Sequence, residues 1–376
     1  MSDTNGCQTL RGVTVLDFST RLPGPLASLM LAQAGARVIK IERPPHGDEV
    51  RAFAPRLGEQ SAHFAWLNRG KESLALDLKR PADRDAVLAL AQSADVLIEQ
   101  FRPGVMERLG LGHAALAERN PRLIYCSITG YGQTDARSMQ AAHDLNYQAS
   151  AGLLGLAAPQ ANGLPALPHV LLGDIAGGTY PAVMSILMAL LDRARTGRGQ
   201  FLDIGMGRNV EVFALWSLID GAVGGKWPRP GAGRHTGGSP RYNLYAAADG
   251  KLLAVAALED HFWRNFLAAI ELEVSPAWEQ SAPAEVIAAV AGRLAQRDAA
   301  DWLAQFAGKD VCCNLAPDLA QAHAENTAMD GVAATGGLPF IRLPIAQQFT
   351  SGPANPPSPA LGQHDDGHGG GPGRRP

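Results

Sequence analysis

The sequence predicts an α/β protein with a Rossmann-like large domain, built on a mostly parallel sheet, and a smaller α+β domain. In the first half, short β-rich runs alternate with helix-like runs, which is typical of parallel strands joined by helical crossovers. After a Gly- and Pro-rich stretch at 224–242, the pattern changes to a hairpin with an Asp-Gly turn and then to amphipathic helices. The chain has 376 residues, 46% of them apolar, which is enough for two hydrophobic cores.

The strands of the large domain are expected where β-branched and aromatic residues gather in short runs. These runs are GVTVLDFS (12–19), RVIKIERP (37–44), ESLALDLKRP (72–81), DVLIEQF (95–101), RLIYCSITGYG (122–132) and QFLDIGM (200–206). Apolar periodicity predicts helices at 25–36 and 83–94, and a longer helix that begins near Asp174. The GxGxxG fingerprint of a dinucleotide site is missing, because RLPGPLAS (21–28) follows the first strand.

The small domain is expected to contain a hairpin at 242–258 and helices at 259–272, 283–296 and 299–307. We place the large domain at 1–225 and 326–364 and the small domain at 240–325. The last residues, 365–376, have few apolar side chains and many glycines, so a disordered tail is expected there.

Composition excludes several classes of partner. The formal net charge is −3 and the basic residues are spread along the chain, so no nucleic acid is expected. The N-terminus lacks a signal-peptide pattern, and the apolar stretch at 182–191 is too short to span a bilayer, so we expect a cytoplasmic protein without a membrane partner. The cysteines lack metal-ligand spacing, which predicts reduced thiols and no metal site; they are Cys7, Cys126, Cys312 and Cys313.

Several motifs follow one another along the chain: LNRGKESLALDLKRP (67–81), DVLIEQFRPGVMERLGLG (95–112), HDLNYQASAGLLG (143–155), GDIAGG (173–178) and RTGRGQFLDIGM (195–206). In this order they resemble the class III CoA-transferases together with the alpha-methylacyl-CoA racemases, the L-carnitine dehydratase/bile-acid-inducible F type. The resemblance implies a large domain that the C-terminal segment rejoins, an inserted small domain, and an interlocked homodimer. It also implies an acyl-CoA thioester as substrate, with coenzyme A as part of that substrate and no permanently bound cofactor.

Two arginines, Arg43 and Arg102, each follow a predicted strand, at the sheet edge where ligands of α/β proteins usually bind. Spacing alone favours solvated surface residues, but the resemblance implies that both bind coenzyme A, whose phosphates need cationic donors. The roles of Arg69 and Lys71 stay open. The coenzyme A site that the resemblance implies consists of Arg43, Ala75, Leu76, Asp77, Leu78, Glu99, Arg102, Ala142 and Asp144.

Asp174 has two interpretations. An aspartate at the start of a helix usually caps it. Beside Gly177 and Gly178, which allow close backbone approach, the same helix start would also bind a thioester and stabilise an oxyanion. The resemblance implies a catalytic Asp174, acting as a nucleophile in the transferases and as a proton donor and acceptor in the racemases.

His143 separates the two reactions, because inversion at Cα needs two acid/base groups and a histidine titrates near neutrality. The racemases resemble this chain at HDLNY, where His143 would be the second base, although a structural histidine at a helix start is the simpler alternative. Glu259 stands where the racemases carry a glutamate that orients this histidine, but Asp260 and His261 replace the residues that usually follow. Asp144 is either a helix cap or a substitute base.

The leading hypothesis is therefore a racemase that inverts 2-methylacyl-CoA thioesters with His143 and Asp174, and with Glu259 in support. The alternative is a CoA-transferase that moves coenzyme A between carboxylic acids through Asp174. A non-catalytic coenzyme A-binding or interaction protein is disfavoured, because all three residues are present.

Overall fold

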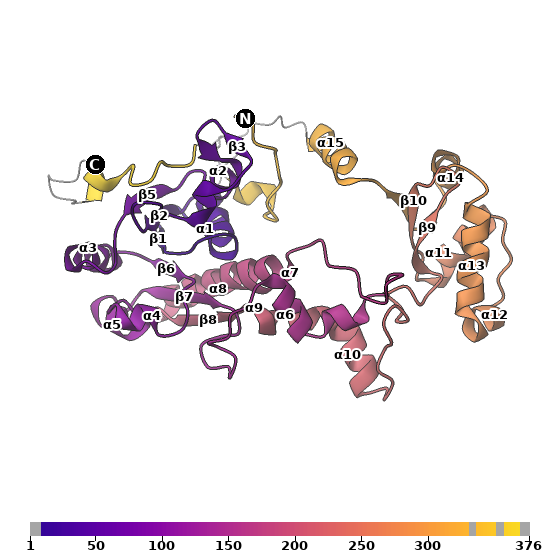
Figure 1. Ribbon diagram of the computed structural model, residues 1–376, viewed down its shortest axis with the longest axis horizontal. Helices are drawn as coiled ribbons and strands as arrows, with labels where there is room; N and C mark the ends of the chain where they lie inside the picture. Colours follow the sequence, from indigo (N-terminus) through magenta and orange to yellow (C-terminus); the bar gives the residue numbers. More distant parts are fainter. Residues whose placement is uncertain (1–8, 331–335, 351–356, 369–376) are drawn as a thin grey trace. The chain divides into compact units, whose positions relative to one another are not determined.

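The computed structural model describes residues 9–330, 336–350 and 357–368. The chain divides into two compact units. Unit 1 comprises 1–151, 170–212 and 332–376, and unit 2 comprises 152–169 and 213–331. Each unit has its own sheet, as Figure 1 shows, so the predicted Rossmann-like and α+β parts are both confirmed.

Unit 1 contains a six-stranded sheet in the order β5-β2-β1-β6-β7-β8. Every pair of neighbouring strands is parallel, so all the carboxyl ends lie at one edge. The strands are β1 (Thr14–Asp17), β2 (Arg37–Glu42), β5 (Glu72–Ala75), β6 (Val96–Glu99), β7 (Ile124–Thr129) and β8 (Phe201–Gly205). Each falls within a run that the sequence predicts, because these strands are buried and rich in β-branched residues.

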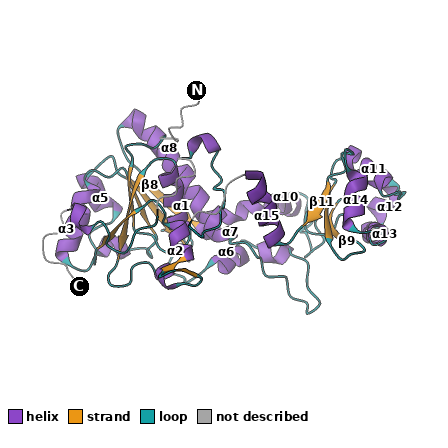
Figure 2. Cartoon of the chain, turned by 90° about the horizontal axis from the view of Figure 1, so that it is seen from above, coloured by secondary structure: helices purple, strands orange, loops and turns teal. Residues whose placement is uncertain are grey.

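Helices cover both faces of this sheet (Figure 2). On one face lie α1 (Pro23–Gln33) and α8 (Tyr180–Thr196), which contact each other and the strands. On the other face, α3 (Pro81–Ala91), α4 (Val105–Arg108) and α5 (His113–Arg119) pack on a core that includes Leu97 and Tyr125. The remaining elements of unit 1 are η1 (Glu49–Ala52), β3 (Arg56–Leu57), β4 (Gln60–Ser61), α2 (Ala62–Leu67), α6 (Asp144–Ser150), α7 (Leu172–Asp174), η3 (Ile175–Thr179), α9 (Met206–Asn209), η5 (Gln347–Phe349) and η6 (Asp365–His368).

A network of buried charges lies beneath the carboxyl edge of β1, β2 and β5. The Lys71 Nζ atom lies 3.2 Å from Asp17 Oδ2, and Lys40 Nζ lies 3.1 Å from Asp48 Oδ2; all four side chains are fully buried. Lys71 also donates to Ser28 Oγ on α1 at 2.7 Å. Buried charges are retained only when paired, so this network ties β1, β2 and α1 together.

The C-terminal segment covers the outer edge of β5. Ser73 and His364 exchange hydrogen bonds, from the Ser73 amide to His364 Nδ1 and from the His364 amide to the Ser73 carbonyl, both at 3.1 Å. The Ala75 amide donates to Asp365 Oδ1 at 2.9 Å. These bonds satisfy backbone groups that an edge strand would leave open. The predicted disorder is therefore wrong at Asp365–His368, which form η6, while 369–376 lie outside the described residues.

Unit 2 is built on an antiparallel sheet in the order β11-β10-β9. Helices α11, α13 and α14 pack on one core, which includes Trp263, Phe266, Val290 and Trp302. The elements are η2 (Leu153–Leu156), α10 (Leu215–Ala222), β9 (Tyr242–Ala246), β10 (Leu252–Ala256), α11 (Asp260–Ala269), α12 (Pro276–Ser281), α13 (Pro283–Leu294), α14 (Ala299–Phe306), β11 (Cys313–Ala316) and α15 (Leu319–Asp330); η4 (Val210–Ala214) crosses from unit 1 into unit 2.

Unit 2 contains more residues than the small domain predicted at 240–325. Residues 152–169 and 213–225 belong to it. The physical reason lies in the Gly/Pro-rich loop: the Gly231 amide donates to the Leu156 carbonyl at 3.0 Å, and Gly221 packs directly against the Trp227 ring. Such long-range contacts do not appear in local sequence patterns.

One helical stretch, Leu172–Thr196, has the length and apolar composition of a membrane span. It is longer than the apolar run in the sequence because α7, η3 and α8 continue without a break. Its most apolar 18-residue window has a mean hydropathy of 1.4, and 39% of that window is buried within the protein. Core helices of soluble proteins meet the same criteria, so this helix is weak evidence for a membrane partner. The described cysteines, Cys126, Cys312 and Cys313, are free thiols, and Cys7 lies outside the described residues.

We predict that Asp365→Ala lowers the free energy of unfolding by about 1 kcal/mol, because it removes the acceptor of the Ala75 amide. Asp366→Ala is the matched control, since this neighbouring carboxylate is exposed. Urea unfolding of both variants measures the difference. Equal stability of the two variants would show that the Asp365 contact contributes nothing.

Candidate active site

Asp174 is the last residue of α7, at the point where the helix widens into the π-helical turn η3. The helix begins at Leu172, and Asp174 itself has helical dihedrals, with φ −68° and ψ −46°. Asp174 therefore does not occupy the capping position that its sequence context predicts. Single π-helical turns inside α-helices occur frequently at functional sites.

The Asp174 carboxylate is half-buried and receives no hydrogen bond from any residue that the structure describes. Burial and, to a smaller extent, the charge of Asp144 raise its pKa to about 6 against the opposing charges of His143 and Arg21. A carboxyl group with a pKa near 6 can exchange protons close to neutral pH. Without a hydrogen-bond donor, it is also available for nucleophilic attack.

Gly177 and Gly178 serve the packing of the π-helical turn. A Cβ atom on Gly177 would lie 2.6 Å from the Met206 carbonyl oxygen of α9, and one on Gly178 would lie 3.2 Å from Pro23 of α1. Asn209 Nδ2 donates to the Gly177 carbonyl at 2.8 Å. The sequence predicts that these glycines allow a ligand to approach the backbone closely. In the structure α1 and α9 make this close approach instead, because both glycines are buried between them.

Asp144 joins α6 to α7. Its buried carboxylate accepts the Asp174 amide at 3.0 Å through Oδ1 and the Gln148 side-chain amide at 2.7 Å through Oδ2. Gln148 also donates to the Val170 carbonyl at 3.2 Å. The Ile175 amide bonds to the Leu171 carbonyl, so this amide and the Asp174 amide are both engaged within the protein. Stabilisation of an oxyanion at this helix start stays a prediction.

His143 is the exposed N-cap residue of α6. Its backbone amide donates to Asn146 Oδ1 at 3.0 Å, and the preceding Ala142 carbonyl accepts the Tyr147 hydroxyl at 3.1 Å. The imidazole lies within electrostatic reach of Asp174, since the charge of His143 lowers the pKa of that carboxyl. Unit 1 thus brings the two predicted catalytic residues together.

Arg43 and Arg102 lie at the same edge of the sheet, after β2 and β6, which are the two neighbours of β1. Both are exposed, and neither guanidinium has a hydrogen-bond or ion-pair partner among the described residues. Two unpaired guanidinium groups on one edge can bind the phosphates of a ligand.

Arg69 and Lys71 are buried, so they differ from the two exposed arginines. Arg69 stacks on the Trp66 ring at 4.4 Å and donates to the Trp66 carbonyl at 2.5 Å; burial lowers its pKa to about 10. Lys71 belongs to the buried network, and burial lowers its pKa to about 8. Lys71 therefore has a structural role.

The segment 75–78 leaves the end of β5, next to β2, at the edge that carries Arg43. Its backbone is partly engaged, because the Ala75 amide bonds to Asp365, the Leu76 amide to the Glu42 carbonyl, and the Asp77 amide to Asp83. Leu76 and Leu78 pack against the core of unit 1. Half-buried backbone and apolar side chains of this kind can form the wall of a nucleotide site.

Glu99 ends β6 and is buried. Burial raises its pKa to about 7, although the Ser127 hydroxyl and the Phe101 amide, which donates at 2.7 Å, stabilise the carboxylate. Glu99 therefore lies at the same edge as Arg102, with its hydrogen bonds directed to the protein.

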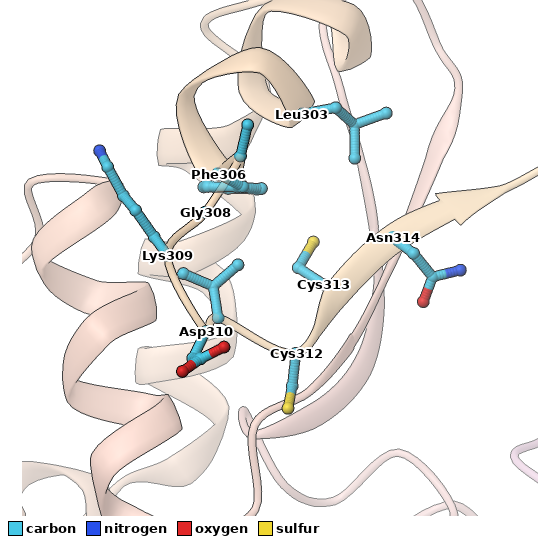
Figure 3. A pocket seen from close by; sticks show the side chains of 10 residues that line it. Leu303, Phe306, Gly308, Lys309, Asp310, Cys312, Cys313 and Asn314 are labelled. Atoms are coloured by element: carbon cyan, nitrogen blue, oxygen red, sulfur yellow. The ribbon is translucent and has the colours of Figure 1, made fainter.

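Glu259 belongs to unit 2, where it is the exposed N-cap residue of α11. Its predicted pairing with His143, which lies in unit 1, stays a prediction. A separate open pocket of about 490 Å³ in unit 2 is lined by residues 303 and 306–314 (Figure 3) and contains none of the predicted site residues. In it, Cys312 and Cys313 point to opposite sides of the strand.

Sequence analysis missed two residues near Asp174. Arg21 follows β1 in the left-handed region, at φ 65°, and its charge lowers the pKa of Asp174. Gln148 holds Asp144 in place. The positive φ of a non-glycine residue gives no local sequence signal, and Gln148 has an ordinary helical context.

Known proteins resemble the chain over nearly its whole length. The sequence family described as CoA-transferase family III matches residues 10–365. The alpha-methylacyl-CoA racemase of Homo sapiens is 36% identical, over 81% of this chain and 76% of that protein. The acetyl-CoA:oxalate CoA-transferase of Acetobacter aceti is also 36% identical, over 78% of this chain and 76% of that protein.

Solved structures agree with this assignment. A CAIB/BAIF family protein from Brucella suis superposes with a TM-score of 0.80 at 28% identity, covering 96% of this chain and 98% of that one. A hypothetical protein from Mycobacterium tuberculosis gives a TM-score of 0.83 at 27% identity, covering 97% and 99%. Because the family match spans residues 10–365 and these structures share the fold, the chain belongs to CoA-transferase family III.

Proposed function

We propose that the protein is an acyl-CoA racemase that inverts the α-carbon of 2-methylacyl-CoA thioesters with two bases. One observation carries this proposal: the Asp174 carboxyl, whose pKa is raised to about 6, has no hydrogen-bond donor and lies within reach of the charge of His143. A carboxyl group and an imidazole placed close together match a reaction that needs an acid/base group on each face of the substrate. The similarity to the human alpha-methylacyl-CoA racemase supports the same assignment.

The proton balance of this reaction is simple. In one direction the Asp174 carboxylate removes the α-proton, the electron pair moves onto the thioester oxygen as an enolate, and protonated His143 returns a proton to the opposite face. The enzyme then holds a protonated Asp174 and a neutral His143, which is the form needed for the reverse direction. In this proposal Glu259 pairs with His143 and orients it.

Coenzyme A is part of the substrate in this proposal, with its phosphates on Arg43 and Arg102. Both guanidinium groups lie at the carboxyl edge of the sheet, flanking β1, and the half-buried segment 75–78 follows the neighbouring strand β5. Ligands of open α/β sheets bind at this edge.

The second candidate is a CoA-transferase in which Asp174 attacks the thioester and forms a mixed anhydride, with release of the coenzyme A thiolate. The thiolate then attacks the aspartyl carbonyl and releases the first carboxylate, which leaves an aspartyl thioester. A second carboxylate takes the coenzyme A by the reverse of these steps. The relative from Acetobacter aceti, a CoA-transferase, favours it. The Asp174 carboxylate without a hydrogen bond fits this role equally well. His143 then has no part in the chemistry, and the two candidates differ in what His143 does.

The interlocked homodimer also remains a proposal. It is supported by Met184, Leu187, Met188 and Leu191, which form an apolar stripe on α8 and are exposed by 54%, 38%, 62% and 72%. Their spacing places them on one face of the helix, and a stripe of this kind usually marks a contact with another surface.

We predict that His143→Ala and Asp174→Asn each nearly abolish inversion of a 2-methylacyl-CoA. Inversion needs both bases, whereas exchange of the α-proton with deuterated water needs only one. The residual deuterium wash-in, followed by mass spectrometry on each isomer, should favour opposite isomers in the two variants. Transfer of coenzyme A to a second carboxylic acid without inversion, retained in His143→Ala and accompanied by an aspartyl adduct on Asp174 of the unmutated protein, would establish the transferase instead.

Replacing Arg43 or Arg102 by alanine should raise the KM for acyl-CoA much more than it lowers kcat. Contacts to a remote phosphate are felt almost equally in the ground state and the transition state. Arg119→Ala is the control, because this exposed arginine lies at the end of α5. An unchanged KM in both variants would place the nucleotide elsewhere.

Asp144→Asn should move the acid limb of the pH profile to lower pH. The charge of Asp144 helps to raise the pKa of Asp174 to about 6, so removing that charge lowers the pKa and keeps the carboxylate ionised in more acidic solution. The measurement is kcat/KM for the isomer that Asp174 deprotonates, over a pH range that brackets 6. Asp85→Asn, an exposed site on α3, is the control; an upward shift in Asp144→Asn would contradict the electrostatic coupling.

A further inference from the structure

We propose that Arg241 is a positioning residue that fixes Glu259 by holding the residues on both sides of it. This inference rests on the proposed role of Glu259 in orienting His143. Arg241 directly precedes β9, and Glu259 stands between the end of β10 and the start of α11. β9 and β10 are antiparallel neighbours that pair from Tyr242 with Ala256, so the two residues leave the same end of the sheet.

The Arg241 guanidinium contacts both neighbours of Glu259. Its Nη1 atom donates to the Leu258 carbonyl at 3.2 Å and to Asp260 Oδ1 at 2.6 Å. One planar group therefore fixes the backbone before Glu259 and the side chain after it. This arrangement limits the rotation of the peptide groups that carry the Glu259 side chain.

The guanidinium is in turn held by Glu279 on α12. Its Nε and Nη2 atoms donate to the two Glu279 carboxylate oxygens at 2.5 and 2.9 Å. The side chains of Arg241 and Glu279 are only 20% and 18% exposed, whereas that of Asp260 is 85% exposed. The paired fork to Glu279 is thus the shielded anchor, and the bond to Asp260 is a screened surface contact.

The Glu259 carboxylate has no hydrogen bond to any residue that the structure describes. Its backbone carbonyl accepts the Trp263 amide at 3.0 Å, which starts α11. The direction of this exposed side chain therefore depends on the backbone of 258–260. Within unit 2, Arg241 is the group that joins this backbone to a second helix.

The experiment is a double-mutant cycle of Arg241→Gln and Glu259→Gln, measured as inversion of a 2-methylacyl-CoA. Removing the outer partner of a metal ligand typically lowers activity on the order of 10- to 100-fold, and we take the same size of loss for the partner of an orienting carboxylate. We expect a loss of this size in kcat for Arg241→Gln, with the KM for acyl-CoA unchanged. In the Glu259→Gln background, Arg241→Gln should have almost no further effect, because coupled residues are not additive.

Arg293→Gln is the matched control. Arg293 also lies in unit 2 and also binds a carbonyl and a carboxylate, Ile270 O and Glu271 Oε2, each at 2.5 Å. It should lower the melting temperature about as much as Arg241→Gln while leaving kcat unchanged. Arg241→Lys keeps the charge but not the fork, so it should fall between Arg241→Gln and the unmutated protein in kcat.

The outcomes separate this inference from the proposed function. If Glu259→Gln is impaired and the Arg241→Gln loss is the same in both backgrounds, Arg241 acts independently of Glu259 and the inference is wrong, while the racemase proposal stands. If Glu259→Gln is fully active, the proposed role of Glu259 fails and the positioning role fails with it. Equal losses of kcat in Arg241→Gln and Arg293→Gln would also overturn the inference, since they would reflect general destabilisation.

Discussion

The buried charge pairs between Asp17 and Lys71 and between Lys40 and Asp48 are the constraint on which unit 1 depends. They lie beneath the carboxyl edge of three strands, fully removed from solvent. Removing one partner would leave an uncompensated buried charge, at a cost of about 3–5 kcal/mol. The pairs therefore fix the loop between β1 and α1 where a dinucleotide-binding fold would place a Gly-rich phosphate loop. In the proposed function, phosphate recognition belongs to the exposed arginines at the same edge.

From this fixed α1, the contacts continue to the candidate catalytic carboxylate. Thr179 at the end of the π-helical turn donates to the Pro23 carbonyl of α1 at 2.8 Å, and Asp144 accepts the Asp174 amide from the other side. Two elements thus determine the position of Asp174 while its side chain stays unbonded. Because the backbone is held and the carboxylate has no hydrogen-bond donor, nothing stabilises the charged form of Asp174 strongly. Burial and the charge of Asp144 can therefore raise its pKa.

The two units differ in how they hold their candidate residues. Unit 1 positions Asp174 by packing and backbone hydrogen bonds, with buried glycines at the contact. Unit 2 presents Glu259 on an exposed helix start, where a single guanidinium holds the flanking residues. The structure also accounts for Asp260, which departs from the racemase motif in the sequence: it pairs with Arg241 at 2.6 Å. In the proposed function Glu259 acts through His143 and has no substrate contact to orient it. Contacts within the protein, such as those of Arg241, must therefore hold it.

Local sequence patterns were enough to predict the strands of the parallel sheet, the main helices, the family and the candidate residues. Hydrophobic periodicity is local and the motifs at His143 and Asp174 are contiguous, so both can be recognised without tertiary structure. Three features became visible only in the folded chain: Lys71 is a buried structural partner, the glycines after Asp174 pack against α1 and α9, and Asp365 docks on β5. Each of these depends on atoms distant in sequence, such as the Ser28 hydroxyl, the Met206 carbonyl and the Ala75 amide. Long-range hydrogen bonds and burial set these roles, and a linear pattern does not encode them.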